Sequence, residues 1–166
     1  SLLPLSGHMD TDGLHFENDP DPKNDGAAMR YAVTPGFFDA MNIPLRSGRL
    51  LDSRDGSGAP RAVLINEAFA RSKFSTNSAL GQRLRLGPNE GDWYTVVGVV
   101  GDVKQSSLDV GTPLNIYVSP TQWHWGDNSM SLVVRARGAA ASLMPAIRGA
   151  TWSCAKGQAS GRGATT

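Results

Sequence analysis

The sequence of this chain lacks most of the features that indicate a chemical function. Its 16 Lys and Arg residues nearly balance its 15 Asp and Glu residues, which leaves a formal net charge of +1. The basic residues are dispersed, so there is no sign of the concentrated cationic face that nucleic acid requires. No apolar run approaches the roughly 20 residues that cross a bilayer. The first ten residues lack a basic region and a long apolar stretch, so we expect no signal peptide there.

Cysteine is almost absent. Cys154 is the only one, so no internal disulfide can form, which is neutral about the cellular compartment. A catalytic thiol would need a nearby histidine, and His8, His15 and His124 are all distant in the sequence. We interpret Cys154 as a small side chain near the C-terminus.

The motifs that would carry chemistry are absent or incomplete. A calcium loop beginning at Asp19 would need glycine at its sixth position and glutamate at its twelfth, where this chain has Asn24 and Arg30. The segment around Gly98 lacks the spacing of a dinucleotide loop, and we interpret it as a buried strand with a bulge or close packing at the glycine. The histidines show no zinc spacing. We therefore predict no catalytic, cofactor-binding or metal-ligating residue.

What is present is an alternation of strand and helix signals. Hydrophobic residues make up 40% of the 166 residues, enough for a sizeable core. Thr34 and Asn66 are placed as helix N-caps. The pattern predicts an α+β fold with short mixed or antiparallel sheets. Its helices are expected near 35–42, 66–75 and 139–152, and its strands near 14–17, 29–33, 43–46, 62–65, 82–86, 94–103, 115–118 and 131–136.

Residues 94–103 give the strongest strand signal. They are rich in β-branched side chains and almost uncharged. A continuous run of this kind is typical of a strand that is covered on both faces. We therefore predict a central strand in which four valines are mostly buried: Val96, Val97, Val99 and Val100.

The polar loop 121–129 carries Trp123, His124 and Trp125. Exposed tryptophans are frequent anchors of protein partners, which makes these three residues the candidate partner contact. The same tryptophans could instead cover the hydrophobic core from outside. The sequence leaves both interpretations open.

Several segments follow one another in an order that carries a family resemblance. They are SLLPLSG (1–7), VTPGFF with IPL (33–45), AVLINEA with LGQRL (62–84), VVGVVGDV (96–103) and PLNIY (113–117). In this order they resemble the MacB-like periplasmic core domains of ABC-transporter permeases of the FtsX/MacB type. The similarity spans nearly the whole chain, although residues 154–163 lack the aliphatic side chains of a closing strand.

The resemblance implies two lobes. Residues 1–45 and 128–166 would build a discontinuous porter-like lobe, and residues 46–127 would form a small inserted α+β lobe. It also implies an extracytoplasmic, periplasmic location within an inner-membrane protein. The partners implied are the membrane helices of the permease chain, a cytoplasmic ATPase domain or subunit, and a periplasmic adaptor. The isolated chain is expected to be a monomer and the full permease a dimer.

The function implied by the resemblance is non-catalytic: the domain would couple membrane-helix motion to export or to a periplasmic partner. The chain begins on an apolar, turn-like segment, which we interpret as an internal piece of a longer protein. Two alternatives remain, a stand-alone periplasmic binding or adaptor domain and a small hydrolase. A pocket holding perturbed titratable groups would favour the hydrolase. Membrane helices in the rest of the reading frame would favour the permease.

Overall fold

Seven strands and two short helices make up residues 11–118 of the described chain. The computed structural model describes residues 11–18, 25–74, 78–87, 91–103, 112–123, 131–136, 143 and 145–149. The strands are β1 (Thr11–Phe16), β2 (Gly26–Ala32), β3 (Leu45–Gly48), β4 (Ala62–Asn66), β5 (Arg83–Leu86), β6 (Trp93–Val100) and β7 (Asn115–Val118), and the helices are α1 (Phe37–Met41) and α2 (Glu67–Lys73).

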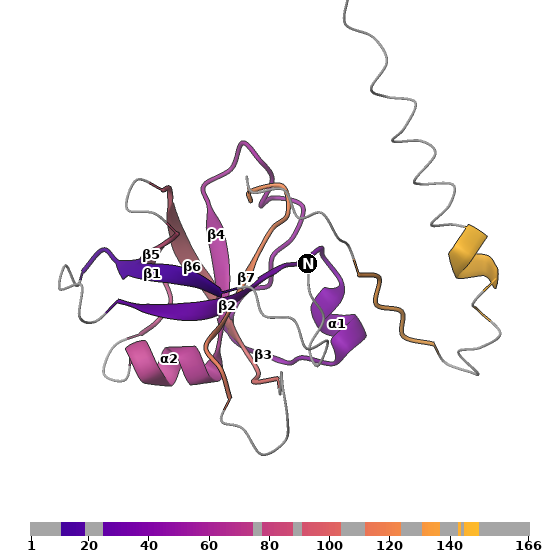
Figure 1. The fold of residues 1–166 in the computed structure, drawn as a ribbon, viewed down its shortest axis with the longest axis horizontal. Coiled ribbons are helices and arrows are strands. Elements are labelled where there is room, and N and C mark those ends of the chain that lie inside the picture. The colour runs from indigo at the N-terminus through magenta and orange to yellow at the C-terminus, as the bar shows by residue number, and fades with distance from the viewer. Residues whose placement is uncertain are drawn as a thin grey trace, which may run out of the picture. The chain divides into compact units, whose positions relative to one another are not determined.

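The strands close into a barrel. They hydrogen-bond in the order β3-β6-β4-β7-β2-β1-β5, and β5 pairs in addition with β6. This last pairing closes a ring of β6, β4, β7, β2, β1 and β5 and leaves β3 attached to β6 outside the ring (Figure 1). The pairs β2–β7 and β4–β6 are parallel and the others are antiparallel. The predicted α+β class with a mixed sheet is confirmed.

Two apolar clusters lie on opposite faces of the strands. We call the first the barrel interior, because all six ring strands and α2 contribute to it: Leu14, Ala28, Ala32, Val63, Ile65, Phe69, Ala79, Leu84, Leu86, Tyr94, Val96, Val99, Ile116 and Val118. We call the second the outer cluster, which α1 helps to cover: Tyr31, Val33, Phe38, Ile43, Leu51, Ala62, Leu64, Val100 and Tyr117. Successive side chains of a strand point to opposite faces, so β4 and β7 are buried at every position.

An irregularity in β6 changes which residues face the interior. Val63 of β4 pairs with Val96, but the next residue, Leu64, pairs with Gly98. A side chain at Gly98 would collide with the carbonyl oxygen of Arg49, whose N–H donates a hydrogen bond to Val97 O of the same strand. A bulge or close packing was predicted at Gly98, and the structure has a register shift beside it and close packing at it.

The burial of the valines of β6 can be compared with the prediction. Val96, Val99 and Val100 are buried, as predicted. Val97 is only partly buried and packs against the outer cluster. Its greater exposure departs from the prediction, because Val97 continues the alternation of the preceding residues and shares a face of β6 with the partly exposed Trp93 and Thr95.

The two helices begin differently. The side chain of Asn66 accepts a hydrogen bond from Phe69 N at 3.1 Å, which confirms Asn66 as the N-cap of α2. The predicted N-cap of α1 is wrong. Its cap is Gly36, with φ of 90° and no side-chain hydrogen bond, because the chain first makes a tight turn in which Phe37 N donates to Thr34 O. That left-handed φ suits glycine and not threonine.

The segment after residue 130 differs from the prediction. Residues 131–136 belong to no described sheet, and Leu132 and Val134 are 60% and 47% exposed. The strand predicted there is wrong, because alternation alone cannot make a strand when no neighbouring strand supplies hydrogen bonds. Residues 145–149 are helical, within the helix predicted near 139–152.

The chain separates into two compact units, residues 1–133 and 134–166. The predicted division into a porter-like lobe (1–45 with 128–166) and an inserted lobe (46–127) stays a prediction. Among the described residues, the sheet itself runs across the predicted boundary after residue 45, since β1 and β2 pair with strands that follow it. No helix of the described residues is long and apolar enough to span a membrane.

Candidate functional site

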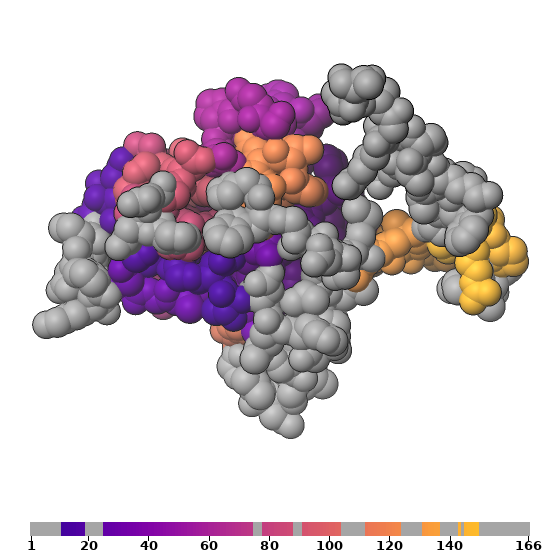
Figure 2. Space-filling model, turned by 45° about the horizontal axis from the view of Figure 1, so that its top comes forward, coloured from indigo at the N-terminus to yellow at the C-terminus, as the bar shows by residue number. Residues whose placement is uncertain are grey.

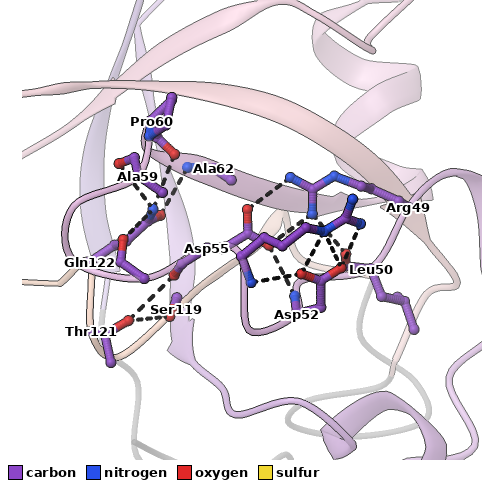
Figure 3. A network of polar contacts seen from close by, with 12 residues as sticks. Arg49, Leu50, Asp52, Asp55, Ala59, Pro60, Ala62, Ser119, Thr121 and Gln122 are labelled. Atoms are coloured by element: carbon purple, nitrogen blue, oxygen red, sulfur yellow. Dashed lines mark hydrogen bonds and ion pairs between the residues drawn. The ribbon is translucent and has the colours of Figure 1, made fainter.

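A buried glutamine fastens the long loop after β3 to the chain that follows β7. Gln122 is only 2% exposed. Its side-chain oxygen accepts a hydrogen bond from Ala62 N at 3.0 Å, and its side-chain nitrogen donates to the carbonyl oxygens of Gly56 and Pro60, each at 3.1 Å (Figure 3). One amide side chain thereby satisfies several backbone groups that would otherwise be buried without partners. We call this arrangement the Gln122 clamp.

The backbone of Gln122 is held as well. Its carbonyl oxygen accepts hydrogen bonds from the hydroxyl of Tyr94 at 3.1 Å and from the guanidinium of Arg61. Tyr94 is 1% exposed, and burial raises the pKa of its hydroxyl. The Tyr94 hydroxyl therefore stays protonated at neutral pH and remains a hydrogen-bond donor. The clamp thus reaches from the surface loop into the barrel interior.

A charged pair shapes the same loop. The guanidinium of Arg49 donates to both carboxylate oxygens of Asp55, each at 2.8 Å, and Asp52 N donates to the same carboxylate at 2.9 Å. Asp55 is 3% exposed, and these bonds from Arg49 lower the pKa of its carboxyl group. Bidentate pairing of this kind is the strong form of an ion pair. The Asp55 carbonyl also accepts from Thr121 Oγ1 at 3.3 Å.

These contacts join two stretches of chain that lie far apart in the sequence. In the space-filling view, the loop of residues 50–60, in purple, lies beside the orange chain around β7 (Figure 2). The loop therefore has well-defined partners along its length. A loop held in this way moves together with the barrel.

A second polar junction lies where α2 begins. Asn66 is fully buried, and its side-chain nitrogen donates to Asp102 Oδ1 at 2.8 Å and to Pro113 O at 3.0 Å. The same Asp102 carboxylate accepts from Ala68 N and from the guanidinium of Arg71, both at 2.8 Å. An acidic group at a helix N-terminus is favourable. The junction ties α2 to the ends of β6 and β7.

The predicted partner contact is only partly within the described residues. Trp123 is partly buried and packs against the barrel interior, with the guanidinium of Arg30 4.3 Å from its ring centre. Arg30 is 6% exposed and lies 3.0 Å from the carboxylate of Asp12. This position matches the covering role considered for Trp123. His124 and Trp125 lie outside the described residues, and the partner contact stays a prediction.

The described side chains offer little for catalysis. His15 Nδ1 lies 2.6 Å from Asp25 Oδ2, which is the base-and-orienter half of a catalytic triad. Within the described residues, however, His15 makes no hydrogen bond to a hydroxyl or thiol nucleophile. No group of three or more His, Cys, Asp or Glu side chains there could hold a metal ion. Instead, the polar groups at this site connect parts of the backbone.

The residues that build the clamp and the junction were not singled out from the sequence, apart from Asn66 as a cap. Gln122 has no distinguishing pattern, and its role arises only when β7 brings it beside the 56–62 loop. Arg49 and Asp55 are six residues apart in a loop, where no regular period relates them.

Comparisons with known proteins assign the family. The model of the MacB-like periplasmic core domain matches residues 9–149. The macrolide export ATP-binding/permease protein MacB of Aggregatibacter actinomycetemcomitans is 26% identical over 91 residues, which are 55% of this chain and 14% of that protein. The chain therefore spans only a small part of this relative's length.

Solved structures share the fold. The periplasmic region of MacB from Actinobacillus actinomycetemcomitans aligns with a TM-score of 0.53 and 22% identity, over 69% of this chain and 46% of that chain. A domain described as part of a permease protein from Porphyromonas gingivalis aligns with a TM-score of 0.52 and 19% identity, over 83% of this chain and 63% of that chain. With the family match extending over most of its length, the chain belongs to the MacB-like periplasmic core domains, the extracytoplasmic part of inner-membrane ABC-transporter permeases.

Proposed function

We propose that this chain is a non-catalytic periplasmic domain that transmits the motion of permease membrane helices to an exported substrate or a periplasmic partner. In this proposal, ATP is hydrolysed by a separate cytoplasmic domain or subunit. The permease acts as a dimer, and a periplasmic adaptor is a further partner. The observation that carries the proposal is the family match over residues 9–149.

The internal connections of the domain support a mechanical role. Motion can pass through a domain only if its parts move together, and the Gln122 clamp and the Asn66–Asp102 junction each join segments distant in the sequence. Each is centred on a buried, hydrogen-bonded amide side chain, Gln122 or Asn66, and such groups specify one arrangement. A domain that moves as one body conveys displacement from its attachment points to the surface that contacts a partner.

The mechanical part is tested in the full parent permease, reconstituted with its ATPase in lipid nanodiscs. Cys154 is replaced by serine and a spin label is attached at Arg54→Cys, because the Arg54 side chain is 74% exposed. Electron–electron distance measurement between the two protomers then compares the nucleotide-free, ATP-bound and vanadate-trapped states. We expect a shifted distance distribution on ATP binding. Unchanged distances during active ATP hydrolysis would contradict the proposal.

The non-catalytic part is tested with the isolated chain. Isothermal calorimetry with magnesium–ATP, zinc and calcium should show no saturable heat, since we place nucleotide binding in another domain. The cytoplasmic ATPase serves as the positive control for magnesium–ATP. Stoichiometric binding of any of the three ligands to the isolated chain would overturn this part of the proposal.

A further inference from the structure

Strand β3 leaves the described sheet with one open edge. Every other strand lies between two hydrogen-bonded neighbours, whereas β3 pairs with β6 alone. All four of its residues are exposed. The N–H and C=O groups on its far side therefore have no strand partner in the described part of the chain. Such an edge accepts an added strand from another protein, which is a common way of recognising extended peptides.

Two exposed leucines lie beside this edge. Leu45, at the start of β3, is 41% exposed, and Leu80 is 37% exposed. Leu80 packs against the other end of the strand, since its Cδ2 would be 2.8 Å from a Cβ placed on Gly48. Among the described residues, the remaining exposed large apolar side chains are Leu132, Val134 and Leu143, which follow the last strand in the sequence. An added strand at β3 would thus meet apolar surface at both ends.

Arg46, which follows Leu45 in β3, adds a positive charge to this edge. The side chain of Arg46 is 53% exposed and its Nε lies 3.1 Å from Glu67 Oε2. An exposed ion pair of this kind contributes little free energy, so the guanidinium can exchange Glu67 for an acidic group on a partner.

The same features oppose pairing between two copies of the chain. An antiparallel β3–β3 pair whose twofold axis passes through residue 46 would place the two Arg46 side chains directly opposite each other. Edge strands protected against self-association are typically short, charged and bulged. β3 has four residues, carries Arg46 and has a register shift between Leu45 and Ser47. These features select against a second copy and in favour of a partner with an acidic residue.

We propose that β3 is the docking edge for an extended segment of a periplasmic partner protein. Apolar side chains of that segment contact Leu45 and Leu80, and an acidic side chain faces Arg46. The existence of a partner rests on the proposed function, whereas the chemistry of the segment rests on this edge alone. Because the edge is short and irregular, the segment makes few backbone hydrogen bonds and binds weakly.

Nuclear magnetic resonance titration of the isotope-labelled chain tests this proposal directly. The probes are three synthetic peptides. EVTVEVT and KVTVKVT differ in charge, and EVPVEVP keeps both glutamates but replaces the threonines by prolines, which cannot donate backbone hydrogen bonds. We expect the acidic peptide to shift the amide signals of residues 45–48 and 80 in a saturable way at millimolar concentration. The lysine peptide should bind about fivefold more weakly, and the proline peptide, which cannot complete a strand ladder, should not bind.

A charge reversal sharpens the test. Arg46→Glu should bind the lysine peptide more tightly than the acidic one, while Leu45→Ser should weaken both without changing their order. Melting temperatures confirm that each variant is folded, as expected for exposed positions. No saturable shift, shifts that map elsewhere, or an unchanged preference in Arg46→Glu would overturn the proposal. Concentration-dependent dimerisation through β3 would overturn it in favour of a second copy. The titration involves no transport, so its failure leaves the proposed function standing.

Discussion

Among the described residues, the barrel interior buries 14 apolar side chains and the outer cluster buries nine, and the two clusters are enclosed in different ways. The interior is surrounded by a ring of hydrogen-bonded strands, so its walls are fixed by the backbone. The outer cluster is covered by α1, a helix of five residues, and by neighbouring loop segments. A helix this short has little stability of its own. Its position therefore depends on the side chains that it covers.

The side chains of the outer cluster are suited to that task. Tyr31 and Tyr117 stack with ring centres 5.5 Å apart, and Phe38 of α1 meets Tyr117 edge-on at 5.1 Å. Such aromatic pairs have preferred geometries and contribute energy beyond the area they bury. The comparison indicates that backbone hydrogen bonds fix the interior, whereas aromatic packing fixes the outer surface. The two regions should respond differently to matched substitutions.

The largest difference is expected within one strand. Val96→Asp places a carboxylate in the barrel interior, where Val96 is 1% exposed, and should abolish folding. An unpaired buried charge costs several kcal/mol, a large part of the stability of a domain. Val97→Asp should give a folded protein with a lower melting temperature, because partly buried Val97 lets the carboxylate reach water.

Circular dichroism of the two purified variants checks this contrast. Val97→Asn, which adds polarity without charge, serves as the control for loss of the valine side chain. A folded Val96→Asp variant with a melting temperature near that of the wild type would contradict this expectation. It would show that the barrel can rearrange to accommodate a charge in its interior.

A smaller difference is expected between two buried phenylalanines. Phe69→Ala and Phe38→Ala remove the same atoms from the interior and from the outer cluster, where the side chains are 0% and 3% exposed. Replacing a buried phenylalanine costs about 3–5 kcal/mol, and the cost rises with the cavity that remains. The cost of Phe69→Ala should lie near the upper end of this range, because the closed ring of strands around the interior cannot contract to fill the cavity. The cost of Phe38→Ala should lie near the lower end of this range, because α1 can move closer to the strands and reduce the cavity.

Urea unfolding of both variants measures the free energy of unfolding. The two values can be compared directly if the free energy falls with urea concentration at the same slope in both variants. The comparison would fail if Phe38→Ala were the more destabilising of the two, since α1 would then be held as firmly as the strands.

The effects that are smallest at pH 7 concern two tyrosine hydroxyls, and one of them grows in alkali. Tyr94→Phe removes the hydrogen bond to Gln122 O and should cost about 1 kcal/mol at pH 7. Tyr31→Phe should be nearly neutral at pH 7, but burial raises the pKa of Tyr31 to about 12. Above pH 10 the unfolded chain loses this proton first, so wild-type stability falls as pH rises towards 12, by about 3 kcal/mol in total.

Tyr31→Phe lacks this group and should lose less stability in alkali than the wild type. Melting temperatures at pH 7, 9 and 11 follow the effect, with Tyr94→Phe measured alongside. Parallel alkaline losses in Tyr31→Phe and the wild type would show that the Tyr31 hydroxyl reaches water more readily than its burial implies.

The sequence was sufficient where a signal is local. The strands near 62–65 and 115–118, the cap at Asn66 and the bulge at Gly98 each depend on a few adjacent residues, and all are present. Residues 131–136 show the limit of this reasoning. They carry the alternation of a strand, but a strand also needs a neighbour, and alternation says nothing about one.

The closed ring of strands and the Gln122 clamp could not be predicted from the sequence, because both depend on contacts between residues far apart in the chain. Pairing of β1 with β5 and of β2 with β7 joins residues about 70 to 90 positions apart, and no local period records such pairings. The Gln122 clamp depends on them, since β7 must first lie beside β2 and β4. From the sequence, the candidate partner residues were tryptophans. The structure adds an exposed strand edge that has no distinctive composition.

The closed ring also constrains how the chain folds during synthesis. Its closing pairs connect the first strand to the fifth and the second to the seventh, so the ring is complete only after β7, which ends at Val118, has been made. Until then β1 and β2 form a hairpin whose apolar face is bare. Non-local pairing of this kind is slow, because the entropy of a long loop is lost before the contacts form. A nascent chain that halts before residue 115 should therefore be captured by chaperones or degraded, whereas one that passes Val118 can close its barrel.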